Sequence, residues 1–189
     1  MAKNITKYLR QIADNLPDVE ARFNDFTEYD LLVGVPNEDA GREETNEINN
    51  ATLAYIHDNG SPAQNIPERP FMIPGIEAAR PRVINVLKNG AKAALKGEKD
   101  AAYTALQASG LIAQAAIRKV INDGVPPPLS EETLKGRIRN GTSIKGAKLE
   151  LKNRAEGQAP SLSSAKPLIA TAQLRNSINY VLRKRDGSN

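Results

Sequence analysis

The sequence contains no cysteine, no tryptophan and a single histidine in 189 residues. The lack of cysteine excludes disulfide bonds, thiolate catalysis and cysteine-ligated zinc. One imidazole cannot supply a zinc or iron site that needs two or three histidines from one chain. Aromatic residues make up only 4% of the chain, which is few for a surface on which bases or sugars stack. We therefore expect no metal, no cofactor and no catalytic site.

Long apolar segments are also missing. The first ten residues lack the apolar stretch of a secretion signal. The longest uncharged run, residues 101–117, is too short and too polar to cross a bilayer. The composition, 40% hydrophobic and 25% charged, is typical of a globular protein. The expectation is a single cytoplasmic domain over residues 1–189 that has no membrane partner.

Charge is distributed unevenly along the chain. Residues 1–70 carry six Lys and Arg against thirteen Asp and Glu, whereas residues 71–189 carry twenty against nine. Opposite charges would let identical copies meet head to tail, and such contacts close into rings when the rotation permits. A basic half is also compatible with nucleic acid. The charges could equally be solvated without sharing a face, so three interpretations stay open at this point.

Hydrophobic periodicity predicts the main elements. Helices are expected over residues 5–16, 47–58, 75–96, 98–122 and 130–139, a helical turn over 171–176, and strands over 29–35 and 177–183. Pro81 would either start its helix or kink it. Gly97 would join the two long helices into a hairpin. Residues 61–74, with four prolines, should be irregular.

Two segments are predicted to be extended, flexible loops. Residues 37–47 are polar and acidic. Residues 140–166 are rich in Gly, Ser, Lys and Asn, with a short strand expected over 148–152. Segments of this composition order on binding, so both loops are candidates for contacts with neighbouring molecules.

Catalytic motifs are not found in the sequence. The chain has no Gly-x-Ser-x-Gly elbow, no P-loop and no Gly-x-Gly-x-x-Gly, the patterns that mark common catalytic and phosphate-binding sites. His57 and Asp58 are adjacent, but neighbouring helical residues point about 100° apart and do not form a dyad by themselves. A hydrolase that uses His57 remains an alternative. The favoured role of His57 is structural: its imidazole would tie the end of a helix to the loop that follows.

Basic side chains are concentrated in the last third of the chain. They are Lys145, Lys148, Lys152, Arg154, Lys166, Arg175, Arg183, Lys184 and Arg185. Only Tyr180 is interleaved with them, and no helix-turn-helix, zinc-finger or ribonucleoprotein pattern is present. A nucleic-acid-binding accessory protein is therefore the alternative from another functional class.

Two segments have a more specific pattern. The first reads Ala-Tyr-Ile-His-Asp-Asn-Gly over residues 54–60, followed by Ile-Pro-Glu-Arg-Pro-Phe-Met over 66–72. The second reads Pro-Leu-Ile-Ala-Thr-Ala-Gln-Leu-Arg-Asn-Ser-Ile over 167–178. In this order, with long helices between them, they resemble a family of tailed-bacteriophage neck proteins, described as tail-completion or head–tail joining proteins. The family pattern has Glu where this chain has Asp58, and Gly where it has Ala172.

Most of the residues in these segments suggest structural or interface roles. The selected positions are His57, Asp58, Gly60, Pro67, Arg69, Pro70, Phe71, Thr171, Leu174 and Ser177. The prolines would stiffen an extended segment that delivers Phe71 into the core. Arg69 would face outward or pair with a carboxylate, for which Asp58 is the candidate. Gly60 is placed where a left-handed C-cap is wanted, and Thr171 would cap a helical turn. If the turn needs a positive φ at Ala172, alanine is unfavourable there.

The resemblance implies an α+β fold, with a small, twisted, mainly antiparallel sheet covered by helices and a long helical hairpin. It implies a structural virion protein that assembles in the host cytoplasm into a homo-oligomeric ring, a hexamer, in the neck. The ring would join the tail tube or tail terminator protein to the head connector and adaptor proteins, and DNA would only pass through its lumen. A tail terminator or another morphogenesis protein is the alternative within this class.

Overall fold

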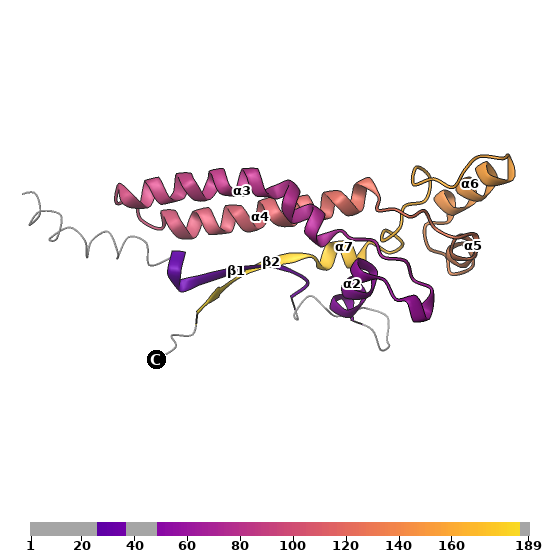
Figure 1. Ribbon diagram of the computed structural model, residues 1–189, viewed down its shortest axis with the longest axis horizontal. Coiled ribbons are helices and arrows are strands. Elements are labelled where there is room, and N and C mark those ends of the chain that lie inside the picture. The colour runs from indigo at the N-terminus through magenta and orange to yellow at the C-terminus, as the bar shows by residue number, and fades with distance from the viewer. Residues whose placement is uncertain (1–25, 37–48, 186–189) are drawn as a thin grey trace, which may run out of the picture. The chain divides into compact units, whose positions relative to one another are not determined.

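The computed structural model describes residues 26–36 and 49–185. These residues form an α+β fold with one two-stranded antiparallel sheet. The elements in chain order are β1 (Tyr29–Gly34), α2 (Asn50–Asn59), the 3-10 turn η2 (Pro62–Gln64), α3 (Met72–Leu95), α4 (Ala101–Asp123), α5 (Glu131–Arg139), α6 (Ile144–Ala155), α7 (Gln173–Ser177) and β2 (Asn179–Lys184), as Figure 1 shows. The predicted helix over 5–16 and the predicted loop over 37–47 lie outside the described residues.

The chain divides into two compact units. The described part of the first, here called the hairpin unit, comprises residues 26–32, 81–111 and 181–185. The second, here called the core unit, comprises residues 33–36, 49–80 and 112–180. Both long helices contribute residues to each unit.

The hairpin unit contains the turn between the two long helices. Gly97 occupies this turn with a φ of +84°, so the predicted hairpin is confirmed. The rings of Tyr29 and Tyr103 have centroids 5.4 Å apart. They meet edge to face, an arrangement that aromatic pairs favour. Pro81 lies inside α3, which begins at Met72, so of the two predicted alternatives the one in which Pro81 starts the helix is excluded.

The core unit is built around Phe71, which is fully buried, as the sequence predicted. Its neighbours are the buried apolar side chains of Ala54, Ile117, Ile121, Val125, Leu174 and Ile178. Arg118 of α4 donates hydrogen bonds to the carbonyls of Asn176 and Ile178, which fix the segment that leads into β2. In β2, Tyr180 and Leu182 are less exposed than Val181 and Arg183, so the predicted alternation is confirmed.

A second apolar cluster lies under α5 and α6 and consists of Leu129, Leu134, Ala147 and Ala165. Helix α5 begins as predicted, because the Ser130 hydroxyl accepts the Thr133 N–H at 3.2 Å, the bond of an N-cap serine. The interpretation of 140–166 as one long loop is wrong for residues 144–155, which form α6, and the strand over 148–152 is wrong for the same reason. Gly146 favoured a loop in the sequence, but in the structure a Cβ there would collide with the Ser164 carbonyl oxygen. The glycine permits close packing inside a helix.

Within the described ranges, no helix combines the length and the apolarity that crossing a membrane requires.

Candidate functional site

The two motifs meet in the core unit although they lie far apart in the sequence. Helices α2 and α7, one from each motif, are in contact. Phe71 from the first motif and Leu174 from the second share one apolar cluster. The sequence predicted that these segments build the fold, and the structure brings them together in a single core.

Asp58 organises the start of α3. Its Oδ1 accepts hydrogen bonds from the backbone N–H groups of Phe71 at 2.7 Å and Met72 at 3.0 Å. These are orphan donors at a helix N-terminus, where a carboxylate is favourable. The helix therefore begins at Met72, three residues before the predicted Gly75. The predicted pairing of Asp58 with Arg69 is wrong, because the carboxylate serves the backbone instead.

Arg69 is buried rather than outward-facing, with 6% of its surface exposed. Its Nε and one terminal nitrogen donate to the Pro127 carbonyl at 3.2 and 3.0 Å. Burial lowers the pKa of the Arg69 guanidinium, because it disfavours the charged form. The flanking Pro67 and Pro70 are exposed. The extended segment therefore delivers two side chains inward, Arg69 and Phe71, where the sequence predicted only the phenylalanine.

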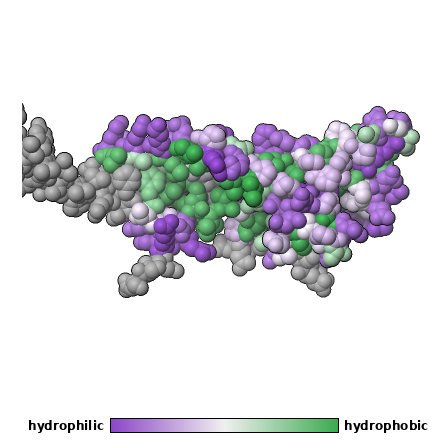
Figure 2. All heavy atoms as spheres, viewed as in Figure 1, coloured by the Kyte–Doolittle hydropathy of each residue, from purple (hydrophilic) through white to green (hydrophobic). Residues whose placement is uncertain are grey.

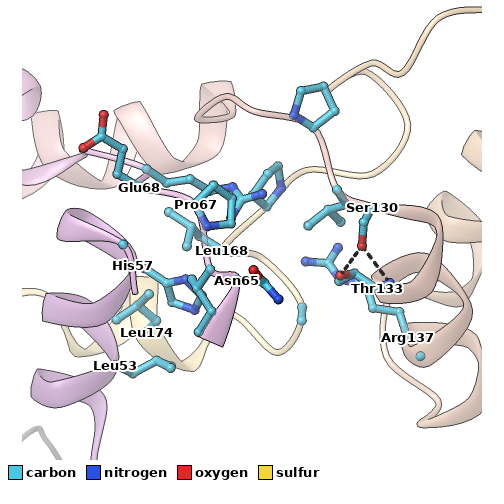
Figure 3. A pocket seen from close by; sticks show the side chains of 18 of the residues that line it. Leu53, His57, Asn65, Pro67, Glu68, Ser130, Thr133, Arg137, Leu168 and Leu174 are labelled. Carbon is cyan, nitrogen blue, oxygen red and sulfur yellow. Dashed lines mark hydrogen bonds between the residues drawn. The ribbon is translucent and has the colours of Figure 1, made fainter. Parts of the chain in front are cut away.

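The end of α2 is tied to this segment through the backbone. The His57 carbonyl accepts the Arg69 N–H at 2.7 Å. The helix end is therefore tied to the next segment by the His57 carbonyl, and the role predicted for the imidazole stays a prediction. The half-buried His57 side chain lines a cavity (Figure 3).

Gly60 ends α2 with a φ of 75° and a ψ of 173°. The positive φ that the sequence predicted is present, but the large ψ differs from that of a left-handed helical C-cap. This region of backbone space is essentially restricted to glycine. Glycine is therefore required at position 60, for a conformation even less accessible to other residues than the predicted one.

The turn before α7 differs from the prediction. Thr171 is exposed and does not cap the helix; the N-cap residue is Ala172, at φ 61° and ψ −1°, with no capping side chain. Ser177 is buried, and its hydroxyl donates to the Leu174 carbonyl at 2.8 Å. The position where the resembled family has glycine thus adopts a left-handed conformation in this chain.

This conformation predicts that Ala172→Gly stabilises the protein. A non-glycine residue in the left-handed region costs about 1 kcal/mol, partly offset by the greater freedom of glycine in the unfolded chain. We expect a gain of up to about 1 kcal/mol in the free energy of unfolding, measured by urea denaturation. Ala155→Gly, at the exposed end of α6, is the control and should destabilise by up to about 1 kcal/mol. Equal losses in both variants would contradict the prediction.

A cavity of about 1190 Å³ opens between the first motif, α5 and the second motif, all within the core unit. Figure 3 shows its walls: His57, Asn65, Pro67 and Leu174 on one side, and Ser130, Thr133 and Arg137 of the α5 region on the other. Arg69 also lines it.

Arg137 was missed by sequence reasoning. It is 8% exposed, and one terminal nitrogen donates to the Lys166 carbonyl at 3.0 Å. Burial lowers the pKa of Arg137, and the nearby charge of Arg69 lowers it further. Nothing in the sequence distinguishes it from the exposed Arg139 two residues later, because both fit the basic last turn of a helix.

The basic side chains of the last third have varied local roles. Arg154 pairs with Glu150, Lys152 with Glu156, Lys184 with Glu28 and Arg185 with Asp30. The side chains of Lys166 and Arg175 both donate to Asn122. Lys145, Lys148 and Lys152 are exposed on α6. Six of the nine basic side chains that suggested nucleic acid thus make ion pairs or hydrogen bonds within this chain.

The described residues also contain no group of three His, Cys, Asp or Glu side chains placed to hold a metal ion. No protein-family model matches this chain, and neither a curated protein nor a solved structure shows significant similarity to it.

Proposed function

We propose that this chain is a structural subunit of the neck of a tailed bacteriophage, a tail-completion or head–tail joining protein that forms a ring of identical copies. The ring, a hexamer in this proposal, would connect the tail tube or terminator protein to the head connector. Its chemistry would be assembly and not catalysis, in the host cytoplasm and then in the virion.

The observation that carries this proposal is that the residues of both motifs serve one packed core. Asp58 caps α3, Phe71 and Leu174 fill the core, and Ser177 bonds to its own helix. A catalytic site would leave polar side chains of the motifs converging on a reacting position. Here the side chains of Asp58, Phe71, Leu174 and Ser177 build a scaffold, which supports a structural protein with the order of segments found in the neck family.

The surface of the described residues also favours association. Large apolar side chains are exposed on the strands and the long helices, among them Leu32 at 45%, Leu111 at 54% and Ile84 at 57%. Figure 2 shows apolar side chains reaching the surface over the hairpin of α3 and α4. The sheet has two strands, so each strand keeps one edge without a described partner strand, and such edges pair readily with another chain. Both features favour packing against further copies.

The proposal is tested by the oligomeric state of the purified full-length protein. Size-exclusion chromatography with light scattering should give a mass several times the 20.5 kDa of one chain, and negative-stain images should show closed rings. Leu32→Lys should yield folded monomers, since it places a charge on the exposed face of β1. Leu149→Lys, at a 50% exposed leucine on α6, is the matched control and should still assemble.

Three results would overturn the proposal. A monomeric wild-type protein at micromolar concentration is one of them. Another is strong, salt-dependent binding to bare duplex DNA, which would favour the nucleic-acid alternative. The third is a hydrolytic activity lost in His57→Ala without loss of the folded state.

A further inference from the structure

The cavity of the core unit contains two buried positive charges that have no negative partner among the described residues. Arg69 and Arg137 are 6% and 8% exposed, and each donates to a main-chain carbonyl. Within residues 26–36 and 49–185 neither guanidinium forms an ion pair, whereas the similarly buried Arg154 is paired with Glu150. A neutral carbonyl leaves the net charge of each guanidinium uncompensated.

Two such charges in one cavity are costly. Removing an ion from water carries a large free-energy cost unless a counter-charge is present. Arginine does not escape this cost by losing its proton, because the guanidinium group stays protonated in proteins. The two guanidinium groups also repel each other, as the effect of Arg69 on the pKa of Arg137 shows. A ligand with negative charge would offset both the cost of burying the two guanidinium groups and the repulsion between them.

The walls of the cavity supply further donors for an anion. Ser130, Thr133 and Thr142 line it, and Asn65 faces Arg137 across the space (Figure 3). The Thr142 hydroxyl already donates to the Arg137 carbonyl at 3.5 Å. In the Ser130–Thr133 hydroxyl pair, 2.9 Å apart, one hydroxyl donates to the other and the second keeps its proton for an anion. Glu68, the acidic residue among the lining residues, is exposed.

We propose that this cavity is an anion-binding site whose ligand presents an oxyanion group with two negative charges to Arg69 and Arg137. This inference is independent of the proposed function. The planar guanidinium group binds the oxygens of phosphates and of carboxylates in the same way. Ligands of both kinds therefore present the same chemistry to this cavity, that of an oxyanion. Two negative charges match two guanidinium groups. Among the described lining residues no Phe, Tyr or Trp is present, which argues against recognition of a stacked base.

The test is isothermal titration of the full-length protein with three probes at low ionic strength: pyrophosphate, citrate and a tetraglutamate peptide. At least one should bind at a single site per chain, and the one that binds best identifies a phosphate, a small carboxylate or an acidic peptide as the source of the oxyanion. Arg137→Gln should weaken binding about 10- to 100-fold, the effect of losing a charge-assisted hydrogen bond.

Arg139→Gln is the matched control, because this exposed arginine lies on the same helix and the substitution changes the net charge equally. It should bind like the wild type. Arg137→Lys, which keeps the charge but not the fork, should bind with intermediate affinity, and circular dichroism should show that each variant is folded. Absence of binding by all three probes, or equal weakening in Arg137→Gln and Arg139→Gln, would overturn the proposal.

Discussion

Replacing Gly75 with alanine should destabilise the core unit by about 3 kcal/mol, at the upper end of the range for overpacking. Gly75 is buried in α3, and a Cβ at this position would lie 2.6 Å from both Cα and Cγ1 of Ile117 in α4. One of these atoms belongs to the backbone, so a change of rotamer cannot relieve the collision. The two helices would have to separate, and the core around Phe71 and Ile117 would open.

Gly136→Ala provides a control of identical chemistry. Gly136 lies inside α5, and a Cβ there would meet no atom within 4 Å. Alanine is a better helix former than glycine, so this variant should be more stable by up to about 1 kcal/mol. Urea denaturation followed by circular dichroism measures both free energies of unfolding. A Gly75→Ala protein as stable as the wild type would contradict the close approach of α3 and α4.

Features that depend on neighbours in the sequence were predicted well. The apolar periodicity of the two long helices, the Ser130 cap of α5, the turn at Gly97 and the alternation in β2 are all local patterns, and the structure has them close to the expected residues. The cap of α3 is different, because Asp58 lies 13 residues before the first N–H group that it accepts. No rule based on local spacing could assign it, so the start of α3 was placed too late.

The candidate site was predicted only in part. The first motif correctly placed Phe71 in the core, since its prolines force an extended chain. It did not show that Arg69 turns inward, because its acceptor, the Pro127 carbonyl, is 58 residues away. Arg137 was missed for the same reason. A buried charged side chain can be predicted from sequence only when its partner lies close to it along the chain. Here the partners are main-chain carbonyls of distant segments.

Helix α6 was missed because its apolar face is small and a buried polar network also holds it. Its outer face carries lysines, and its sequence has few large apolar residues. The side chain of Glu150 is 1% exposed, and it accepts hydrogen bonds from Arg154 Nε at 3.0 Å, the Ser161 N–H at 2.8 Å and the Ser161 hydroxyl at 3.0 Å. Arg154 also donates to the Leu129 carbonyl at 2.9 Å. This network adds to the few apolar contacts of α6, which by themselves form too short a stripe to predict a helix.

Glu150→Ala should therefore destabilise the protein by about 3–5 kcal/mol, because removing one partner of a buried pair leaves Arg154 charged and uncompensated. Glu156→Ala is the matched control. Glu156 lies 3.7 Å from Lys152, and both side chains are exposed. Such an exposed pair contributes at most about 1 kcal/mol. Urea denaturation of the two variants should separate these losses clearly, and similar small losses in both would contradict a stabilising role for the network.

The pH dependence of the free energy of unfolding gives an independent measure of how much the Glu150 carboxylate stabilises the protein. Burial raises the pKa of Glu150, but the hydrogen bonds from Ser161 and Arg154 lower it more, so the folded-state pKa lies below its ordinary value of 4.5. Between these two values the unfolded chain binds more protons than the folded one, so stability falls as the pH falls. The contribution of Glu150 should be complete above about pH 5 and should disappear as the pH drops through the lowered pKa.

Glu150→Gln keeps the shape but cannot titrate, so the difference in unfolding free energy between wild type and this variant should shrink as the pH is lowered. A difference that stays constant from neutral pH to pH values below the ordinary pKa would show that the charge of Glu150 does not stabilise α6.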